Sequence, residues 1–259
     1  LPLTGVGRRW VEGAPRRTAA AEPPLMQDAR QVWLCSEEDR RRLLRLGEAR
    51  AELRVMPNGL PPERFRAAGP REAPPSRVEG RAPELLFLGQ LGYPPNQQAA
   101  RFLARRLAPR LAETAPAAAI VVAGRDPSRK LAERIAARPN MQLLVDPPEV
   151  APLLARADLM LVPLFQGGGT RLKALEALAA GLPLVATPLA VEGLDLVPER
   201  EVLLGRGARD LVRQCLRLLE DQGLYRRLSA AGLAAYAARF APEVLGPKVA
   251  AALEAAVQR

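Results

Sequence analysis

Short apolar segments alternate with longer amphipathic ones over the last two thirds of the chain. The apolar segments, each a candidate strand, lie at 84–89, 118–123, 141–145, 159–163, 183–186 and 201–204. Continuous apolar strands that alternate with helices are typical of a parallel sheet covered on both faces. The pattern therefore predicts an α/β fold, with a doubly wound, Rossmann-like parallel sheet over roughly 84–238.

The amphipathic segments predict the helices of this domain. They have apolar residues at helical spacing and occupy 96–113, 128–138, 149–158, 170–181, 208–221, 222–238 and 242–257. Pro109 is an obstacle inside the first of them, because proline has no N–H to donate to the helix ladder. Helices of this kind are expected on both faces of the sheet.

The first quarter of the chain has a different pattern. Strands are expected at 31–36 and 53–57. Between them the segment EEDRRRLLRLG is predicted to be a helix, with a capping-box-like start formed by Ser36 and Asp39 and an end at Gly47. We expect residues 1–66 to form a partial N-terminal segment outside the main sheet. The proline-rich stretch 67–83 has few apolar residues and is predicted to be a linker or an exposed crossing.

Composition narrows the function classes. The chain has 259 residues and no histidine, which removes Ser-His-Asp and Cys-His catalysis and most zinc sites from it. Two cysteines make no disulfide framework, so a reducing cytoplasm is the expected compartment. The net charge of +10 is spread along the chain and would attract acidic partners unspecifically, an anionic membrane surface among them. With aromatic residues at 4%, base-stacking platforms are scarce and no nucleic-acid partner is expected.

The stretch 164–187, LFQGGGTRLKALEALAAGLPLVAT, holds the strongest candidate site. Gly167, Gly168 and Gly169 fall between a strand and a helix, at the sheet edge where doubly wound domains bind ligands. Backbone N–H groups and the helix dipole at such a point attract anions, and glycine lets the backbone approach them closely. Thr170 is a suitable N-cap.

The helix that follows carries two charged residues on one face. Lys173 and Glu176 are three residues apart, so the lysine could neutralise a phosphate while the glutamate accepts hydrogen bonds from ribose hydroxyls. Leu172, Leu175 and Leu178 are expected to face the sheet. The same stretch also fits a plain turn before a capped helix with a surface Lys–Glu pair, and spacing alone leaves both readings open.

Other nucleotide-binding motifs are missing from the sequence. The segment after the first strand of the domain, GQLGYPPN, is not a G-x-G-x-x-G fingerprint, and there is no Walker lysine motif. No D-x-D sequence suggests a metal-bound diphosphate. Neither a dinucleotide-dependent dehydrogenase nor an NTPase is supported.

Several separate segments, in order, carry a family resemblance. They are VMPNGLPPERF, ELLFLGQLGYPPN, IVVAGRD and EVAPLLARADLMLVPLFQGGGTRLKALEALAAGLPLVATPLAVEGL. From about residue 28 onward, the chain resembles the C-terminal, donor-binding half of a family 4 (group 1) glycosyltransferase of the GT-B type. Such enzymes have two doubly wound domains, one for the acceptor and one for the nucleotide sugar, with the reaction in the cleft between them.

The resemblance implies roles for individual residues. Glu176 matches the second glutamate of the family's E-x7-E motif, which holds the donor ribose, whereas Gly168 replaces the first, a sugar contact. Arg171 and Lys173 would lie beside the diphosphate. Residues with further implied roles are Gly89, where the backbone approaches the phosphates, Arg125, which could add positive charge there in place of the uncharged Gln90, and Val145 to Pro147, which would border the base. The catalytic residues stay unknown, and the resemblance implies no required metal or other cofactor.

The implied activity is transfer of a sugar from a nucleotide-diphosphate sugar to an unidentified glycan or lipid acceptor, in the cytoplasm or peripheral to the inner face of the membrane. Residues 1–66 are then interpreted as a remnant of the acceptor domain, 84–238 as the donor domain, and 239–259 as the helix that crosses back. The chain is expected to be a donor-domain fragment or a short member of the family. Two alternatives remain open: a non-catalytic nucleotide-sugar-binding domain derived from such an enzyme, and a GT-B sugar-nucleotide epimerase.

Overall fold

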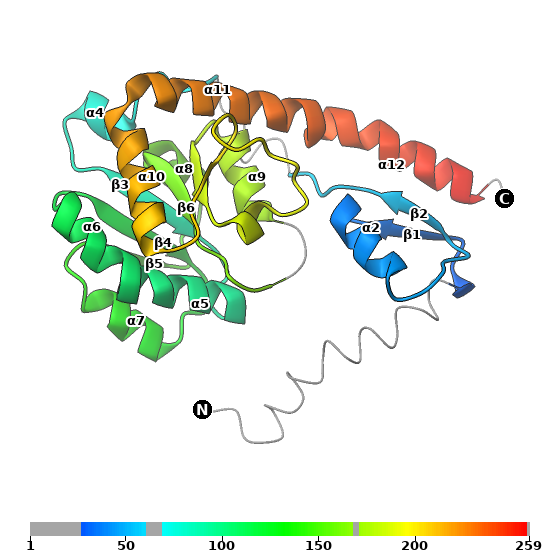
Figure 1. Cartoon of the computed structure of the whole chain (residues 1–259), viewed down its shortest axis with the longest axis horizontal. Helices are drawn as coiled ribbons and strands as arrows, with labels where there is room; N and C mark the ends of the chain where they lie inside the picture. The colour runs from blue at the N-terminus through cyan, green and yellow to red at the C-terminus, as the bar shows by residue number, and fades with distance from the viewer. Residues whose placement is uncertain (1–26, 61–68, 168–170, 258–259) are drawn as a thin grey trace. The chain divides into compact units, whose positions relative to one another are not determined.

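The computed structural model describes residues 27–60, 69–167 and 171–257. The chain divides into two compact units (Figure 1). The smaller comprises residues 1–57 and 246–259, and the larger residues 58–245. Each unit is described by itself below.

A six-stranded parallel sheet forms the centre of the larger unit. Its strands are β3 (Glu84–Leu88), β4 (Ala119–Gly124), β5 (Met141–Val145), β6 (Leu159–Val162), β7 (Leu184–Ala186) and β8 (Leu203–Leu204). They are ordered β5-β4-β3-β6-β7-β8, and every pair is parallel. The predicted parallel sheet is therefore confirmed, with each predicted strand present.

The strand order decides where a ligand would bind. β3 lies at the centre, and the chain moves outward from it in one direction through β4 and β5 before it returns to β6 on the other side. Such a reversal opens a crevice at the carboxyl ends of the two central strands. In this sheet the crevice falls at the ends of β3 and β6.

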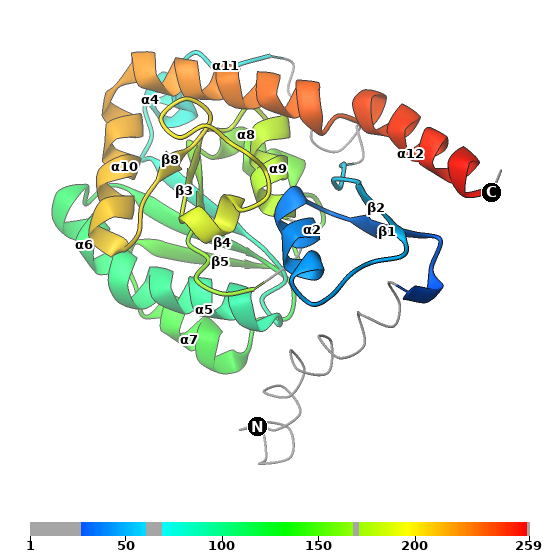
Figure 2. The same cartoon turned by 45° about the vertical axis from the view of Figure 1, so that its right-hand side comes forward.

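Helices cover both faces of the sheet, as the amphipathic pattern predicts (Figure 2). α5 (Pro94–Phe102), η1 (Leu103–Leu107), α6 (Ala108–Thr114), α7 (Arg129–Ala136) and α10 (Ala208–Glu220) lie on one face. α8 (Ala151–Arg156), α9 (Leu172–Ala179) and α11 (Gln222–Arg239) lie on the other. A four-residue 3₁₀ turn, η2 (Pro188–Val191), follows β7. Apolar side chains of both layers are buried against the strands, for example Leu103, Leu107 and Leu175, which have no exposed surface.

Pro109 changes the helix predicted over 96–113. Helical structure runs from Pro94 to Thr114, but five residues before the proline, η1, form a π turn. Because Pro109 has no N–H to donate, the regular ladder is interrupted there, and a π turn is a common way to accommodate such an interruption. The proline therefore changes the hydrogen-bond pattern over one turn without ending the helix.

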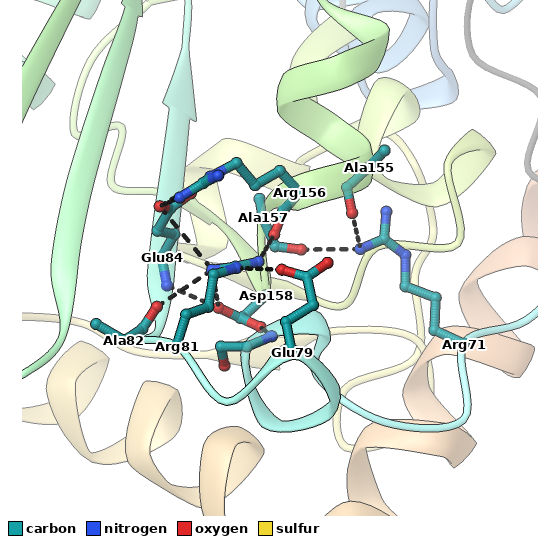
Figure 3. A network of polar contacts seen from close by, with 10 residues as sticks. Arg71, Glu79, Arg81, Ala82, Glu84, Ala155, Arg156, Ala157 and Asp158 are labelled. Carbon is teal, nitrogen blue, oxygen red and sulfur yellow. Dashed lines mark hydrogen bonds and ion pairs between the residues drawn. The ribbon is translucent and has the colours of Figure 1, made fainter.

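The stretch 67–83, predicted to be a linker, is built into the larger unit where it is described. It contains a short helix, α4 (Pro75–Glu79), and the buried carboxylate of Asp158 accepts hydrogen bonds from the Ser76 and Glu84 amides at 2.8 and 2.7 Å. Arg71 donates to the Leu154 and Ala157 carbonyls at the end of α8, at 2.6 and 2.8 Å. These polar contacts, of which Figure 3 shows those of Arg71 with Ala157 and of Asp158 with Glu84, fix a segment that offers few apolar side chains.

In the smaller unit, β1 (Gln31–Leu34) and β2 (Glu52–Val55) form a separate parallel pair joined through α2 (Glu37–Leu44). Ser36 caps α2, since its side chain accepts a hydrogen bond from the Asp39 amide at 3.1 Å. The predictions of this cap and of a segment outside the main sheet are confirmed for the described residues. The last helix, α12 (Pro242–Val257), supplies residues to both units. Whether residues 1–66 are a remnant of an acceptor domain stays a prediction.

Candidate functional site

A pocket of about 670 Å³ lies at the carboxyl edge of the sheet in the larger unit, where β3, β4, β5 and β6 end. It is lined by backbone and side chains from the loops after these strands and from the first turns of α5 and α9. Of the residues that the sequence singles out, it brings together Gly89, Arg125, Gly167, Arg171, Lys173 and Glu176. The pocket thus lies at the crevice that the strand order creates.

The glycine run begins with a residue that needs glycine. Gly167 has φ +112°, a backbone conformation that other residues rarely adopt, and a Cβ there would lie 3.1 Å from the Pro95 ring. Gly168, Gly169 and Thr170 lie outside the described residues. α9 begins at Leu172 with Arg171 in the N-cap position and no side-chain cap. The helix thus starts two residues later than the predicted 170, and the residue in the N-cap position is not the expected Thr170.

Lys173, on the first turn of α9, is half-buried in the pocket wall. Its ammonium donates to Asn96 Oδ1 at 3.0 Å and lies 5.8 Å from the centre of the Phe87 ring. Burial lowers the pKa of Lys173 from its ordinary value to about 8; Glu176 opposes this shift and Arg171 adds to it. The lysine is therefore held in a partly desolvated position where its charge is not fully compensated.

Two arginines add positive charge to the lining. Arg171 is buried, at 5% exposed, donates to the Gly167 carbonyl at 3.1 Å and lies 3.5 Å from the Glu192 carboxylate. Arg125, at the end of β4, is exposed. With Glu176 as the carboxylate among the described lining residues, the pocket carries a net positive charge.

Two glycines allow the loops at the pocket to approach each other. A Cβ on Gly124 would lie 1.7 Å from the Gly89 carbonyl oxygen, a distance that no side chain could occupy. A Cβ on Gly89 would lie 2.8 Å from the Asn96 amide nitrogen. Gly89, predicted to face phosphates, therefore also has a structural reason to be glycine.

Asn96 is a site residue that the sequence analysis missed. Its side chain is buried, and it connects the loop after β3 with Lys173 on α9, 77 residues away. The only signal in the sequence is a polar residue directly after a Pro-Pro pair at a helix start. That signal predicts a helix terminus and no contact with α9.

Two predictions about side-chain placement need correction or adjustment. Leu172 is 44% exposed and lines the pocket, so it does not face the sheet, whereas Leu175 and Leu178 are buried as predicted. Leu172 is the first residue of α9, and at this end of the helix its side chain lines the pocket and is not buried against the sheet. Val145 is 52% exposed and outside the lining; Pro147, Pro148 and Val150 take that part of the wall.

Among the described residues, no three His, Cys, Asp or Glu side chains gather in a way that could hold a metal ion. None of the helices in the described part of the chain combines the length and apolar character needed to cross a bilayer.

Several solved structures share this fold, and glycosyltransferases are among them. HepE of Anabaena, in a complex with UDP and glucose, superposes with a TM-score of 0.76 at 16% identity, over 93% of this chain and 67% of HepE. Sucrose-phosphate synthase of Thermosynechococcus elongatus gives 0.75 at 20% identity, over 94% of this chain and 63% of the synthase. The C-terminal domain of the group 1 protein LpcC of Francisella tularensis gives 0.53 at 15% identity, with 71% and 99% covered.

At these identities the structures establish the fold, and this chain spans only about two thirds of the first two. A comparison with curated protein sequences gives no match. The family model "Glycosyl transferases group 1" matches residues 82–221, which is more than half of the chain and includes all six strands of the sheet that forms the pocket. The chain belongs to the group 1 glycosyltransferases.

Proposed function

We propose that the pocket at the carboxyl edge of the sheet binds a nucleoside-diphosphate sugar, and that the protein transfers the sugar from it to an acceptor. The observation that carries the proposal is the convergence of Arg125, Arg171 and Lys173 with one carboxylate, Glu176, at the crevice of a doubly wound sheet. A diphosphate brings the negative charge that this lining lacks.

The lysine and the arginines account for the diphosphate part of the ligand. Lys173 is half-buried, so an incoming anion would meet its charge in a partly desolvated site where electrostatic attraction is stronger than in water. In the transfer reaction the diphosphate leaves with extra negative charge. Basic side chains fixed in advance stabilise that charge more than they stabilise the bound donor, and this difference lowers the barrier.

Glu176 is assigned to the ribose. It lies one helical turn beyond Lys173 on the same face of α9 and lines the same pocket. A carboxylate accepts two hydroxyl hydrogen bonds, which suits the vicinal hydroxyls of a ribose. The base then lies towards Pro147, Pro148 and Val150, which offer an apolar wall rather than specific donors.

The fit to HepE, whose complexes contain UDP, glucose and UDP-glucose, supports a nucleotide sugar as the partner. We further propose a reaction that needs no bound metal, since basic side chains serve the diphosphate, and a location in the cytoplasm, peripheral to an anionic membrane surface. The acceptor is a glycan or a lipid whose binding site this unit does not define.

Calorimetric titration with UDP, GDP and ADP, with and without EDTA, tests the donor site. We expect one of the nucleotides to bind, EDTA to leave its affinity unchanged, and the corresponding nucleotide sugar to compete with it. Product analysis after incubation with that nucleotide sugar distinguishes transfer from epimerisation. Absence of binding by all three nucleotides would overturn the proposed donor site.

A further inference from the structure

Asn96 makes contacts that connect three parts of the pocket. It lies in the first turn of α5 and is 6% exposed. Its Nδ2 donates to the Gln90 carbonyl at 2.9 Å, and its Oδ1 accepts from Lys173 Nζ at 3.0 Å. The missing side chain of Gly89 makes room for this amide. One side chain therefore links the loop after β3 to the lysine on α9.

We infer that Asn96 is a positioning residue, which holds the Lys173 ammonium in the pocket wall so that its charge is available to an anionic ligand. The inference rests on the proposed function for the identity of that ligand, a nucleoside diphosphate. Asn96 itself acts through Lys173.

The direction of the amide follows from its two hydrogen bonds. An asparagine amide has a donating and an accepting end, and the Gln90 carbonyl can only accept. The donating end is thereby committed to the loop, and the accepting oxygen is left for the lysine. The backbone of the loop after β3 thus sets the position of the ammonium.

The neutral character of the amide matters as much as its geometry. A carboxylate at this place would also accept the hydrogen bond, but it would neutralise the ammonium and repel a diphosphate. An amide fixes the lysine and leaves its charge for the ligand. Asparagine, rather than aspartate, is the side chain that meets both needs.

The groups around Lys173 define how it titrates. Burial lowers the pKa of Lys173 to about 8, Glu176 on the same helix raises it, and Arg171 lowers it. Arg125 and Tyr93 also line the pocket. The hydrogen bond that Lys173 donates to Asn96 Oδ1 favours the charged lysine, because an acceptor interacts more strongly with an ammonium than with an amine. Removing it should lower the pKa of Lys173 further.

Lysine titration by NMR tests the link without any ligand. The chain has three lysines, and the other two, Lys130 and Lys248, are exposed. In protein labelled with ¹³C at lysine Cε, we expect Asn96→Ala to lower the pKa of Lys173 by about one unit, the size of a lost hydrogen bond to a charged group. Asn96→Asp should raise it, while the other two lysines keep their midpoints.

Asn140→Ala is the matched control. The Asn140 amide also donates to a backbone carbonyl, that of Ala108 at 2.9 Å, but it does not line the pocket. This variant should leave the Lys173 midpoint in place. If Asn96→Ala and Asn96→Asp leave it in place as well, Asn96 only supports the fold and the inference is overturned.

Nucleotide titration separates this inference from the proposed function. At pH 7 we expect roughly tenfold weaker nucleoside-diphosphate binding for Asn96→Ala, and a larger loss for Asn96→Asp despite its higher lysine pKa. Equal affinity of both variants and the parent chain would contradict the inference. No binding by the parent chain would instead overturn the proposed function, while the lysine midpoints still decide whether Asn96 positions Lys173.

Discussion

The two edges of the sheet differ in their balance of charge. At the amino edge, three arginines lie among three carboxylates, whereas at the carboxyl edge three basic side chains line a pocket that contains one carboxylate. The amino-edge network consists of Arg71, Arg81, Arg156, Glu79, Glu84 and Asp158 (Figure 3). The carboxyl-edge pocket has Arg125, Arg171, Lys173 and Glu176. Positive charge is matched at the first edge and in excess at the second.

This difference indicates that the basic residues at the amino edge stabilise the fold, whereas those at the carboxyl edge are available to bind a ligand. At the amino edge, Arg156 forms a bidentate ion pair with Glu84, and Arg71 donates hydrogen bonds to the last carbonyls of α8. Cations at helix carboxyl ends and paired with carboxylates stabilise the fold. At the other edge, burial of Lys173 disfavours its charge. We therefore expect removal of a paired charge to lower stability at the amino edge, and removal of the Lys173 charge to raise stability at the carboxyl edge.

The largest effect is expected from Asp158→Ala. The buried Asp158 carboxylate accepts from the Ser76 and Glu84 amides and lies 3.6 Å from Arg81, so its loss leaves these two amides without their acceptor and removes one of the carboxylates beside Arg81. We expect the free energy of unfolding to fall by about 3 kcal/mol. Urea denaturation measures the change. The exposed pair Arg129–Glu133 provides the control, since Glu133→Gln should change stability by less than about 0.5 kcal/mol. A similar loss in both variants would show that burial does not distinguish the two pairs.

Glu176→Ala is expected to act on binding. Loss of hydrogen bonds from ribose hydroxyls to a charged acceptor costs about 1.5–3 kcal/mol, or roughly ten- to a hundredfold in nucleoside-diphosphate affinity. Because Glu176 lines the pocket, fold stability should change far less than in Asp158→Ala. Calorimetry measures the affinity and urea denaturation the stability. A loss of stability without a loss of affinity would place Glu176 among the structural residues.

Lys173→Met is expected to weaken binding and strengthen the fold. The folded-state pKa of Lys173, about 8, lies below the ordinary value of 10.5, so the unfolded chain binds this proton more tightly. The lysine therefore lowers stability below pH 8, and the penalty fades as pH rises from 8 to 10.5. At pH 7 the variant should unfold at a higher urea concentration than the parent chain, with the difference shrinking by pH 10.

The same titration should appear in nucleotide binding. Only the charged lysine attracts phosphate, so the affinity of the parent chain for nucleoside diphosphates should fall as pH rises from 7 to 9, by up to about tenfold. Lys173→Met should abolish this pH dependence and weaken diphosphates more than monophosphates. Lys130→Met, at an exposed position, is the control. An unchanged pH profile in Lys173→Met would mean that another group governs it.

The smallest effect is expected at Val145. Its side chain is half-exposed and outside the pocket lining, while Val150 contributes to that lining. Val145→Ala should change nucleotide affinity by less than about twofold, and Val150→Ala by several-fold because it removes apolar contact with the base. If calorimetry shows a larger loss of affinity for Val145→Ala than for Val150→Ala, the base lies beside Val145, as the family resemblance implies.

The strands were predictable from the sequence because short, continuous apolar runs between amphipathic helices are typical of buried strands in a parallel sheet. Each of the six predicted strands is present, with ends that differ by a residue or two. The attachment of residues 69–83 to the larger unit was not predictable in the same way, because it depends on polar contacts, such as Arg71 to Leu154 and Ser76 to Asp158, between residues distant in the chain. The spacing of hydrophobic residues in the sequence does not predict such contacts.

The pocket was predictable in part for a similar reason. Gly167, Arg171, Lys173 and Glu176 lie close together in the sequence, so one helix start brings them to one place. Asn96 reaches the site from another helix, and its partner on α9 is visible only in the folded chain. Leu172 was misplaced because an apolar residue at the first position of a helix need not follow the face of the later turns.

The donor site is the central claim, and calorimetric titration at pH 7 with UDP, GDP and ADP tests it most directly, on the parent chain, Glu176→Ala and Asp158→Asn. We predict that the parent chain binds one nucleoside diphosphate, that Glu176→Ala binds it at least tenfold more weakly, and that folded Asp158→Asn binds it like the parent. No binding by the parent chain, or equal binding by Glu176→Ala, would contradict the account.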